Sequence, residues 1–305
     1  MTRHAADTRS LSANWPMLAL LVTCYGLWTV ATVLLPAWAA IPVLVLVLTL
    51  HASLSHEALH GHPTRSDMLN AVLVFPALGL AVPYLRFRDT HLAHHRDAVL
   101  TDPYDDPETN YLDPAIWWHL PRIVRGVLAV NNTLAGRILI GPAIGQALFM
   151  WSDLQAIRRG DMRVLASWLL HVPAVALVVW WLMAVGTLPA WAYLLAAYGA
   201  MGVLKVRTFL EHQAHHHVGG RTVVIEDRGL MALLFLNNNY HIVHHMHPDV
   251  PWHRLPALYF DNAARYLGRN HGYRYRNYAQ IARRYLFRAK DSVPHPLWDG
   301  PDAPR

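Results

Sequence analysis

Two long stretches without charged residues predict two pairs of membrane helices. No Asp, Glu, Lys or Arg occurs in residues 11–55 or in residues 164–204. A bilayer core about 30 Å thick takes about 20 apolar residues as a helix, so each stretch is long enough for two passes. Pro36 interrupts the first stretch and residues 186–189 interrupt the second. We therefore expect an all-α protein with four transmembrane helices in two hairpins, at residues 16–35, 38–55, 164–185 and 189–208.

Three other segments are apolar or amphipathic but are not expected to cross. Residues 68–85 contain two prolines, and a full crossing there would carry residues 91–95 to the opposite side from the other polar segments. We predict that residues 68–85 and the short run 229–236 are re-entrant or interfacial. Residues 115–160 mix Trp and Arg with apolar residues, which is typical of amphipathic helix at a membrane surface.

Composition and charge agree with a multi-pass membrane protein. The 305 residues are 54% hydrophobic and 15% charged, against about a quarter charged in an ordinary soluble domain. Every Lys and Arg lies outside the two charge-free stretches, so the positive-inside rule places both termini and all polar segments in the cytoplasm. The net charge of +6 is therefore explained without a nucleic-acid partner. A cleaved signal peptide ending near residues 37–39 is disfavoured, because a second apolar span follows at once.

The chain is expected to form one domain over residues 1–290 with a tail after it. Residues 265–290 are rich in Arg and Tyr and are predicted to lie on the cytoplasmic side against anionic lipid or a partner. Residues 291–305 contain four prolines and are predicted to be a loose tail.

Cysteine and histidine content limits the chemistry to nitrogen and oxygen ligands. Cys24 is the single cysteine, so an internal disulfide, a Cys-based zinc site and an iron–sulfur cluster are excluded. Histidine, by contrast, occurs 21 times. Any metal is therefore expected to be held by imidazole and oxygen.

The histidines occur in spaced groups. Residues 56–60 read H-E-x-x-H, and the pattern H-x-x-H-H occurs twice, at residues 91–95 and 241–245. Residues three and four apart share one face of a helix, so each group can converge on a metal. His212 follows the fourth predicted span. The nine candidate metal ligands are His56, His60, His91, His94, His95, His212, His241, His244 and His245.

Neighbouring polar residues are candidates for orienting these ligands. An acidic loop follows the second group, and its side chains either hold ligand imidazoles or form a solvated surface. Of the asparagines at residues 237–239, which favour a turn or a helix N-cap, Asn238 or Asn239 is assigned to a ligand or to metal-bound water. Residues 215–217 are interpreted as a flexible surface run, and the role of His62 stays open. The acidic loop residues are Asp97, Asp102, Asp105, Asp106 and Glu108.

Nine imidazoles exceed the four that one tetrahedral zinc takes. Divided over two metals they provide four or five each, although imidazole suits iron, copper and zinc alike. The groups lie at the ends of predicted membrane elements, where a metal can meet a lipid chain. Redox chemistry on an apolar chain is favoured over hydrolysis, which usually needs a general base beside the metal.

The order of these motifs over about residues 16–258 resembles the integral-membrane fatty acid desaturase family. This histidine-box superfamily also holds lipid hydroxylases and carotenoid ketolases. Residues 239–252 are similar to bacterial members. The resemblance implies a cytoplasmic non-haem diiron centre bound by the nine histidines, O₂ as co-substrate, a lipid acyl substrate, and electrons from a ferredoxin or cytochrome. It also implies a bacterial inner membrane. The chain differs from many members of the family in having Glu57 where they have Asp.

The sequence leaves several functions to compare. An O₂-dependent desaturase is the leading hypothesis, with a lipid or carotenoid hydroxylase or ketolase on the same site as the alternative. A zinc protease would use only His56, Glu57 and His60. A metal carrier is least expected, because transport ligands should lie within the spans, which contain only His51 and His171.

Overall fold

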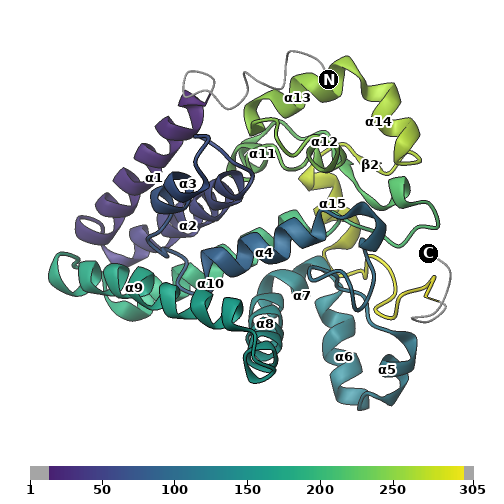
Figure 1. The fold of residues 1–305 in the computed structure, drawn as a ribbon, viewed down its shortest axis with the longest axis horizontal. Coiled ribbons are helices and arrows are strands. Elements are labelled where there is room, and N and C mark those ends of the chain that lie inside the picture. Colours follow the sequence, from purple (N-terminus) through teal and green to yellow (C-terminus); the bar gives the residue numbers. More distant parts are fainter. Residues whose placement is uncertain (1–13, 299–305) are drawn as a thin grey trace.

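The computed structural model describes residues 14–298, which are mostly helical (Figure 1). Residues 1–13 and 299–305, which include the end of the predicted C-terminal tail, lie outside the described residues. Four long helices form a bundle: α1 (Trp15–Val33), α2 (Ala37–Leu59), α9 (Met162–Ala184) and α10 (Ala190–Thr208). Their order along the chain follows the prediction, and α1 packs on α2 as the first hairpin requires. In the second pair, however, α10 packs mainly on α2, and α9 packs on α4 (Tyr84–His94) and α8 (Gly141–Arg158) instead.

Helix α2 is the centre of the bundle and packs against both α1 and α10. By length and composition, α1, α2 and α9 are apolar enough to cross a membrane. Helix α10 carries Lys205 and Arg207 in its last turn and does not reach the same hydropathy. Helix α2 extends beyond the predicted boundary at residue 55, so His56 lies in its last turn.

The segment between the hairpins does not form another long helix. Helix α3 (Asp67–Leu73) is followed by a non-helical stretch and then by α4 (Tyr84–His94). Leu78 in the stretch is fully buried and belongs to the core of the bundle. Helix α11 (Leu230–Leu234) is similarly short and packs against α2.

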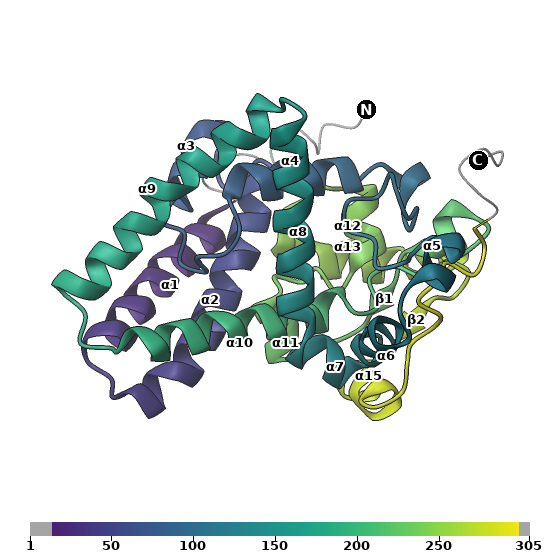
Figure 2. The ribbon, with the colours of Figure 1, turned by 90° about the horizontal axis from the view of Figure 1, so that it is seen from below.

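Residues 115–160 divide into several helices, where one amphipathic region was predicted. Pro121 precedes α6, and Asn132 and Ile140 follow α6 and α7 as their C-caps. In Figure 2, α8 crosses α10 at a steep angle. The helices are α5 (Pro114–His119), α6 (Arg122–Asn131), α7 (Leu134–Leu139) and α8 (Gly141–Arg158).

The C-terminal part forms a cap of short elements at the end of the bundle. Strands β1 and β2 pair in parallel, with Val224 opposite Arg274. Residues 291–298 differ from the loose tail that was predicted, because His295 is buried and its amide donates to the Leu112 carbonyl. The elements of the cap are β1 (Val224–Ile225), α12 (His241–Met246), α13 (Leu255–Asp261), α14 (Ala263–Arg269), β2 (Arg274–Tyr275) and α15 (Tyr278–Tyr285). The described residues also form 3₁₀ turns at Asp97–Val99, Val218–Arg221 and Trp252–Arg254.

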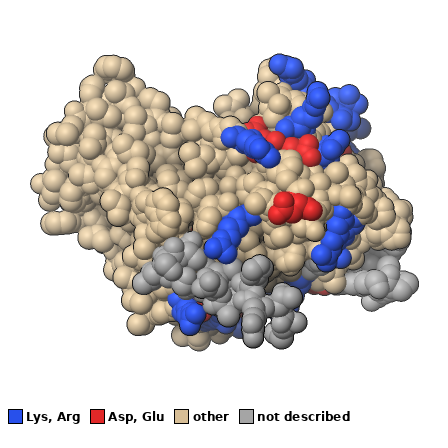
Figure 3. Space-filling model, turned by 90° about the horizontal axis from the view of Figure 1, so that it is seen from above, with Lys and Arg blue, Asp and Glu red and all other residues tan. Residues whose placement is uncertain are grey.

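Charged side chains are distributed unequally between bundle and cap. On the face shown in Figure 3, Lys, Arg, Asp and Glu gather over the half that holds the cap, and the half formed by the bundle shows none. Many large apolar side chains of the bundle are exposed, such as Val22, Trp38 and Met183. An apolar surface of this size is typical of contact with lipid rather than water.

Candidate metal centre

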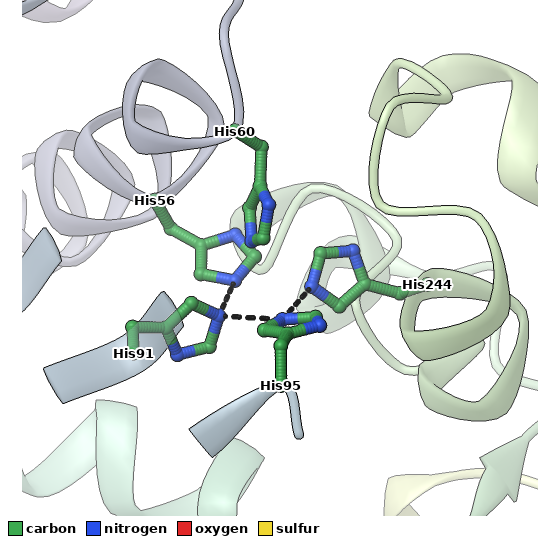
Figure 4. Close-up of side chains that lie close together, drawn as sticks. All are labelled: His56, His60, His91, His95 and His244. Carbon is green, nitrogen blue, oxygen red and sulfur yellow. Dashed lines mark hydrogen bonds between the residues drawn. The ribbon is translucent and has the colours of Figure 1, made fainter. Parts of the chain in front are cut away.

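All nine histidines predicted as ligands converge in two adjoining groups. Within each group the ligand atoms lie within 4.8 Å of one another. Figure 4 shows the first group, with rings from α2, α4 and α12 facing a common centre. The first group is His56, His60, His91, His95 and His244, and the second group is His94, His212, His241 and His245.

Each H-x-x-H-H motif, which we call a triad of histidines, is divided between the two groups. At the end of α4, His91 and His95 enter the first group, whereas His94 enters the second. Helix α12 gives His244 to the first group and its two other histidines to the second. The expectation that three histidines of one triad share a metal is therefore corrected: α4 and α12 each lie between the groups.

The distances within each group fit coordination of a metal ion. Two nitrogens that each lie about 2.1 Å from a metal at right angles are about 3.0 Å apart. In the first group, the Nε2 atoms of His56 and His91 lie 2.9 Å apart, and those of His95 and His244 lie 3.1 Å apart. In the second group, the Nε2 atoms of His94 and His212 lie 2.9 Å apart.

His60 gives a separate indication of metal binding. Its Nε2 atom is buried and has no hydrogen-bond partner among the described residues. A buried polar atom without a partner costs free energy, which a ligand at that position would recover. The donor set of the first group therefore fits a metal.

Two carboxylates of the acidic loop hold ligand imidazoles. His91 Nδ1 donates to Glu108 Oε1 over 2.9 Å, and His94 Nδ1 donates to Asp106 Oδ1 over 2.7 Å. With Nδ1 protonated, Nε2 keeps its lone pair for a metal. Asp102 instead accepts from main-chain amides of its own loop. The side chain of Asp97 lies outside the described residues.

Glu211 belongs to the site and had no role in the sequence interpretation. It lies next to His212, and its Oε1 is 3.7 Å from His241 Nδ1 and 3.2 Å from Arg207 Nε. Asn238 connects Glu211 to His241, because its Nδ2 donates to Glu211 and its Oδ1 accepts from His241 Nδ1. The sequence signal for Glu211 was its position beside a ligand.

The two assigned asparagines have different contacts. Asn238 touches the ligand His241, as described above. The Nδ2 of Asn239 donates to the main-chain carbonyls of Ile225 and Asp227, at 2.6 and 3.0 Å. Asn239 therefore holds β1 beside the start of α12, and we assign the orienting role to Asn238.

Glu57 is buried, and its Oε2 accepts a hydrogen bond from the Trp252 amide over 3.2 Å. This bond fastens the turn after α12 to the end of α2. A zinc protease would instead need this carboxylate as a base beside the metal. The five imidazoles of the first group also exceed what such a protease uses.

The environment of the site keeps most of the imidazoles outside the spans neutral. Burial lowers the pKa of His60, His241 and His244 well below 6.5. Neutral imidazole is the form that binds metals. Burial also acts against a proton on His94, but Glu108 and Asp106 outweigh it and raise its pKa to about 9. Near neutral pH, a metal that binds at His94 would therefore displace a proton.

The remaining histidines of the run after α10 lie apart from both groups. His215 and His217 contact the ring of His271, with ring centroids 4.7 and 5.1 Å away, and His216 is exposed. His62 is buried after the end of α2 and belongs to neither group.

An apolar cavity of about 330 Å³ lies near the first group. It lies between α2, α9, α10 and the stretch that joins α3 to α4. Phe87 lines the cavity and contacts His91, with ring centroids 5.7 Å apart. Ser55, beside His56, also lines it. Phe87 and Ser55 therefore separate the cavity from the imidazoles of the first group by one layer of side chains.

Comparison with known proteins agrees with this site. A family model described as fatty acid desaturase matches residues 32–278, which include all nine histidines and the walls of the cavity. No individual curated protein matches the chain. Because the matched segment covers most of the chain, the protein belongs to the fatty acid desaturase family.

Proposed function

We propose that the protein is an O₂-dependent desaturase that introduces a double bond into an acyl chain of a membrane lipid. The observation that carries the proposal is the apolar cavity beside the first histidine group, whose lining residue Phe87 contacts the ligand His91. An acyl chain fits its lining, and membership of the family supports acyl oxidation. Hydroxylation or ketolation on the same site is the other outcome that the experiment below distinguishes.

Two iron ions are the proposed cofactor, one in each histidine group. Their chemistry, when bound, is the activation of O₂ for removal of hydrogen from an unactivated carbon. Asp106 and Glu108 hold the imidazoles of His94 and His91 in the ligating tautomer. Phe87 and the other apolar residues of the cavity exclude water beside the first group.

The proposed reaction balances with an external electron donor. A –CH₂–CH₂– unit loses two hydrogens and becomes –CH=CH–. O₂ takes these two hydrogens together with two electrons and two protons and leaves as two waters. A ferredoxin or a cytochrome is the proposed donor. It would meet the cap on the cytoplasmic side, where the positive-inside rule places the basic segments.

Lipid analysis with a ligand variant tests the proposal. We expect that a host expressing the protein gains lipids two mass units lighter, and that His94→Ala abolishes both this change and stoichiometric iron. The control is His216→Ala, which removes an exposed histidine outside both groups. A gain of oxygen would instead assign a hydroxylase or ketolase. A wild-type protein that binds no iron would contradict the proposal.

A further inference from the structure

The stretch between α3 and α4 forms one wall of the cavity and is not helical. We call residues 73–82 the wall segment, which consists of the last residue of α3 and the non-helical residues after it; most of its residues line the cavity. Non-helical backbone at membrane depth needs partners for its polar groups, because no water is available there. The bonds made by its carbonyls are therefore informative.

Four side chains from four different helices donate to carbonyls of the wall segment. Tyr25 of α1 donates to Leu73, and Gln146 of α8 donates to Ala81, each over 2.8 Å. His171 Nε2 of α9 and the Tyr193 hydroxyl of α10 donate to the carbonyls of Leu80 and Leu78, also over 2.8 Å. A carbonyl only accepts, so His171 carries its proton on Nε2.

The backbone conformation of the wall segment is strained. Leu80 has a φ of 63°, in the left-handed region that a bulky side chain rarely adopts. Such a conformation persists only where the surroundings hold it, and it is typical of ligand clamps. The hydrogen bond from His171 is made to the carbonyl of this residue.

The wall segment continues directly into α4, which carries His91 at the first histidine group. Its position therefore determines which part of a chain in the cavity lies beside that group. We propose that Tyr25, Gln146, His171 and Tyr193 are positioning residues that hold the wall segment and so determine where along an acyl chain the enzyme acts. This proposal rests on the proposed function.

His171 and Gln146 are the most direct probes of this role. Tyr25 and Tyr193 also contact His51 and Trp28, so their removal would disturb the bundle in other ways. His171→Leu and Gln146→Met remove the donor and keep a side chain of similar size. His171→Gln keeps an N–H near the same position. Tyr198→Phe is the matched control, because its hydroxyl donates to the Leu139 carbonyl, outside the wall segment.

The measurement is the position of the double bond, or of added oxygen, in lipids from cells expressing each variant, together with iron per chain. We expect His171→Leu and Gln146→Met to keep wild-type iron and to raise the share of minor positional isomers roughly five-fold. That factor corresponds to a hydrogen bond of about 1 kcal/mol. His171→Gln and Tyr198→Phe should keep the wild-type ratio.

Three results would overturn the assignment. An unchanged isomer ratio in both variants would show that the bonds do not determine position. Loss of iron in His171→Leu, or an equal change in Tyr198→Phe, would show a general effect on the fold. A wild-type protein that oxidises no acyl chain would refute the proposed function itself, and the assignment with it.

Discussion

At the scale of single residues, the site depends on carboxylates that hold the histidines. Asp106 is buried and accepts from His94 Nδ1, and its other oxygen accepts from the Thr101 amide. Glu211 combines a buried ion pair with Arg207 and a hydrogen bond from Asn238. Such contacts fix ring orientation and make the ligand nitrogen more basic.

Glu108 provides a test of this support. Glu108→Gln keeps the shape of the side chain but removes the charge that faces His91 Nδ1 over 2.9 Å. We expect iron affinity to fall about 10–100-fold, the usual effect of losing a partner of a metal-bound histidine. Competition with a chelator measures it. Asp105→Asn, in the same loop, is the control, and equal affinity in both variants would contradict the role of Glu108.

At the scale of elements, the C-terminal segment (residues 286–298) holds two parts of the site together. Lys290 Nζ donates to the main-chain carbonyl of His212 over 3.0 Å. The Tyr111 hydroxyl, at the end of the acidic loop, donates to Asp291 and accepts from the Ala214 amide. The segment lies beyond the residues that match the family. It nevertheless links the end of the acidic loop to the residues after α10, which include the ligand His212.

Lys290→Met removes the charged donor of this link. We expect the free energy of unfolding to fall by about 1.5–3 kcal/mol, because a hydrogen bond from a charged and largely buried side chain is lost. Denaturant unfolding in detergent micelles measures the change. Arg288→Met removes an exposed charge from the same segment and should be neutral. Equal stability of the two variants would show that the contact of Lys290 with His212 is dispensable.

At the scale of the whole molecule, the apolar bundle and the charged cap imply one orientation in a membrane. The turn between α9 and α10 lies at the far end of the bundle from the histidine groups (Figure 1). The end of α10 leads into the cap, and the last turn of α2 contacts the cap through the hydrogen bond between Glu57 and Trp252. If the four crossings predicted from the sequence are made, we expect the cap to face the cytoplasm and the α9–α10 turn to face the opposite side.

Cysteine labelling tests this orientation, because Cys24 is the single and fully buried cysteine. In a Cys24→Ala background, Ala190→Cys places a thiol at the exposed start of α10, and Ala279→Cys places one on the exposed surface of α15. We expect a membrane-impermeant maleimide to label the first variant in intact cells and the second only after lysis. Labelling of both in intact cells would contradict four crossings.

Much of the helix layout followed from local pattern. The charge-free stretches and the break at Pro36 predicted helices that end within a few residues of those observed. The amphipathic region at 115–160 was less well predicted, because α6 ends at its C-cap Asn132 and α7 begins at once from its N-cap Thr133. The ordered part of the C-terminal tail was missed, since its contacts are with Leu112 and Tyr111, which are distant in sequence.

The sequence by itself determined the helix pairs and the nine candidate ligands, because hydropathy and the i, i+3, i+4 spacing are local properties of a chain. Only the tertiary structure decided how the ligands divide. His94 and His95 are adjacent in sequence and enter different groups, because consecutive side chains of a helix diverge and meet different neighbours. Glu211 and the donors to the wall segment likewise became visible only through contacts between distant helices. Such contacts depend on packing in three dimensions, which leaves no periodic signal along the chain.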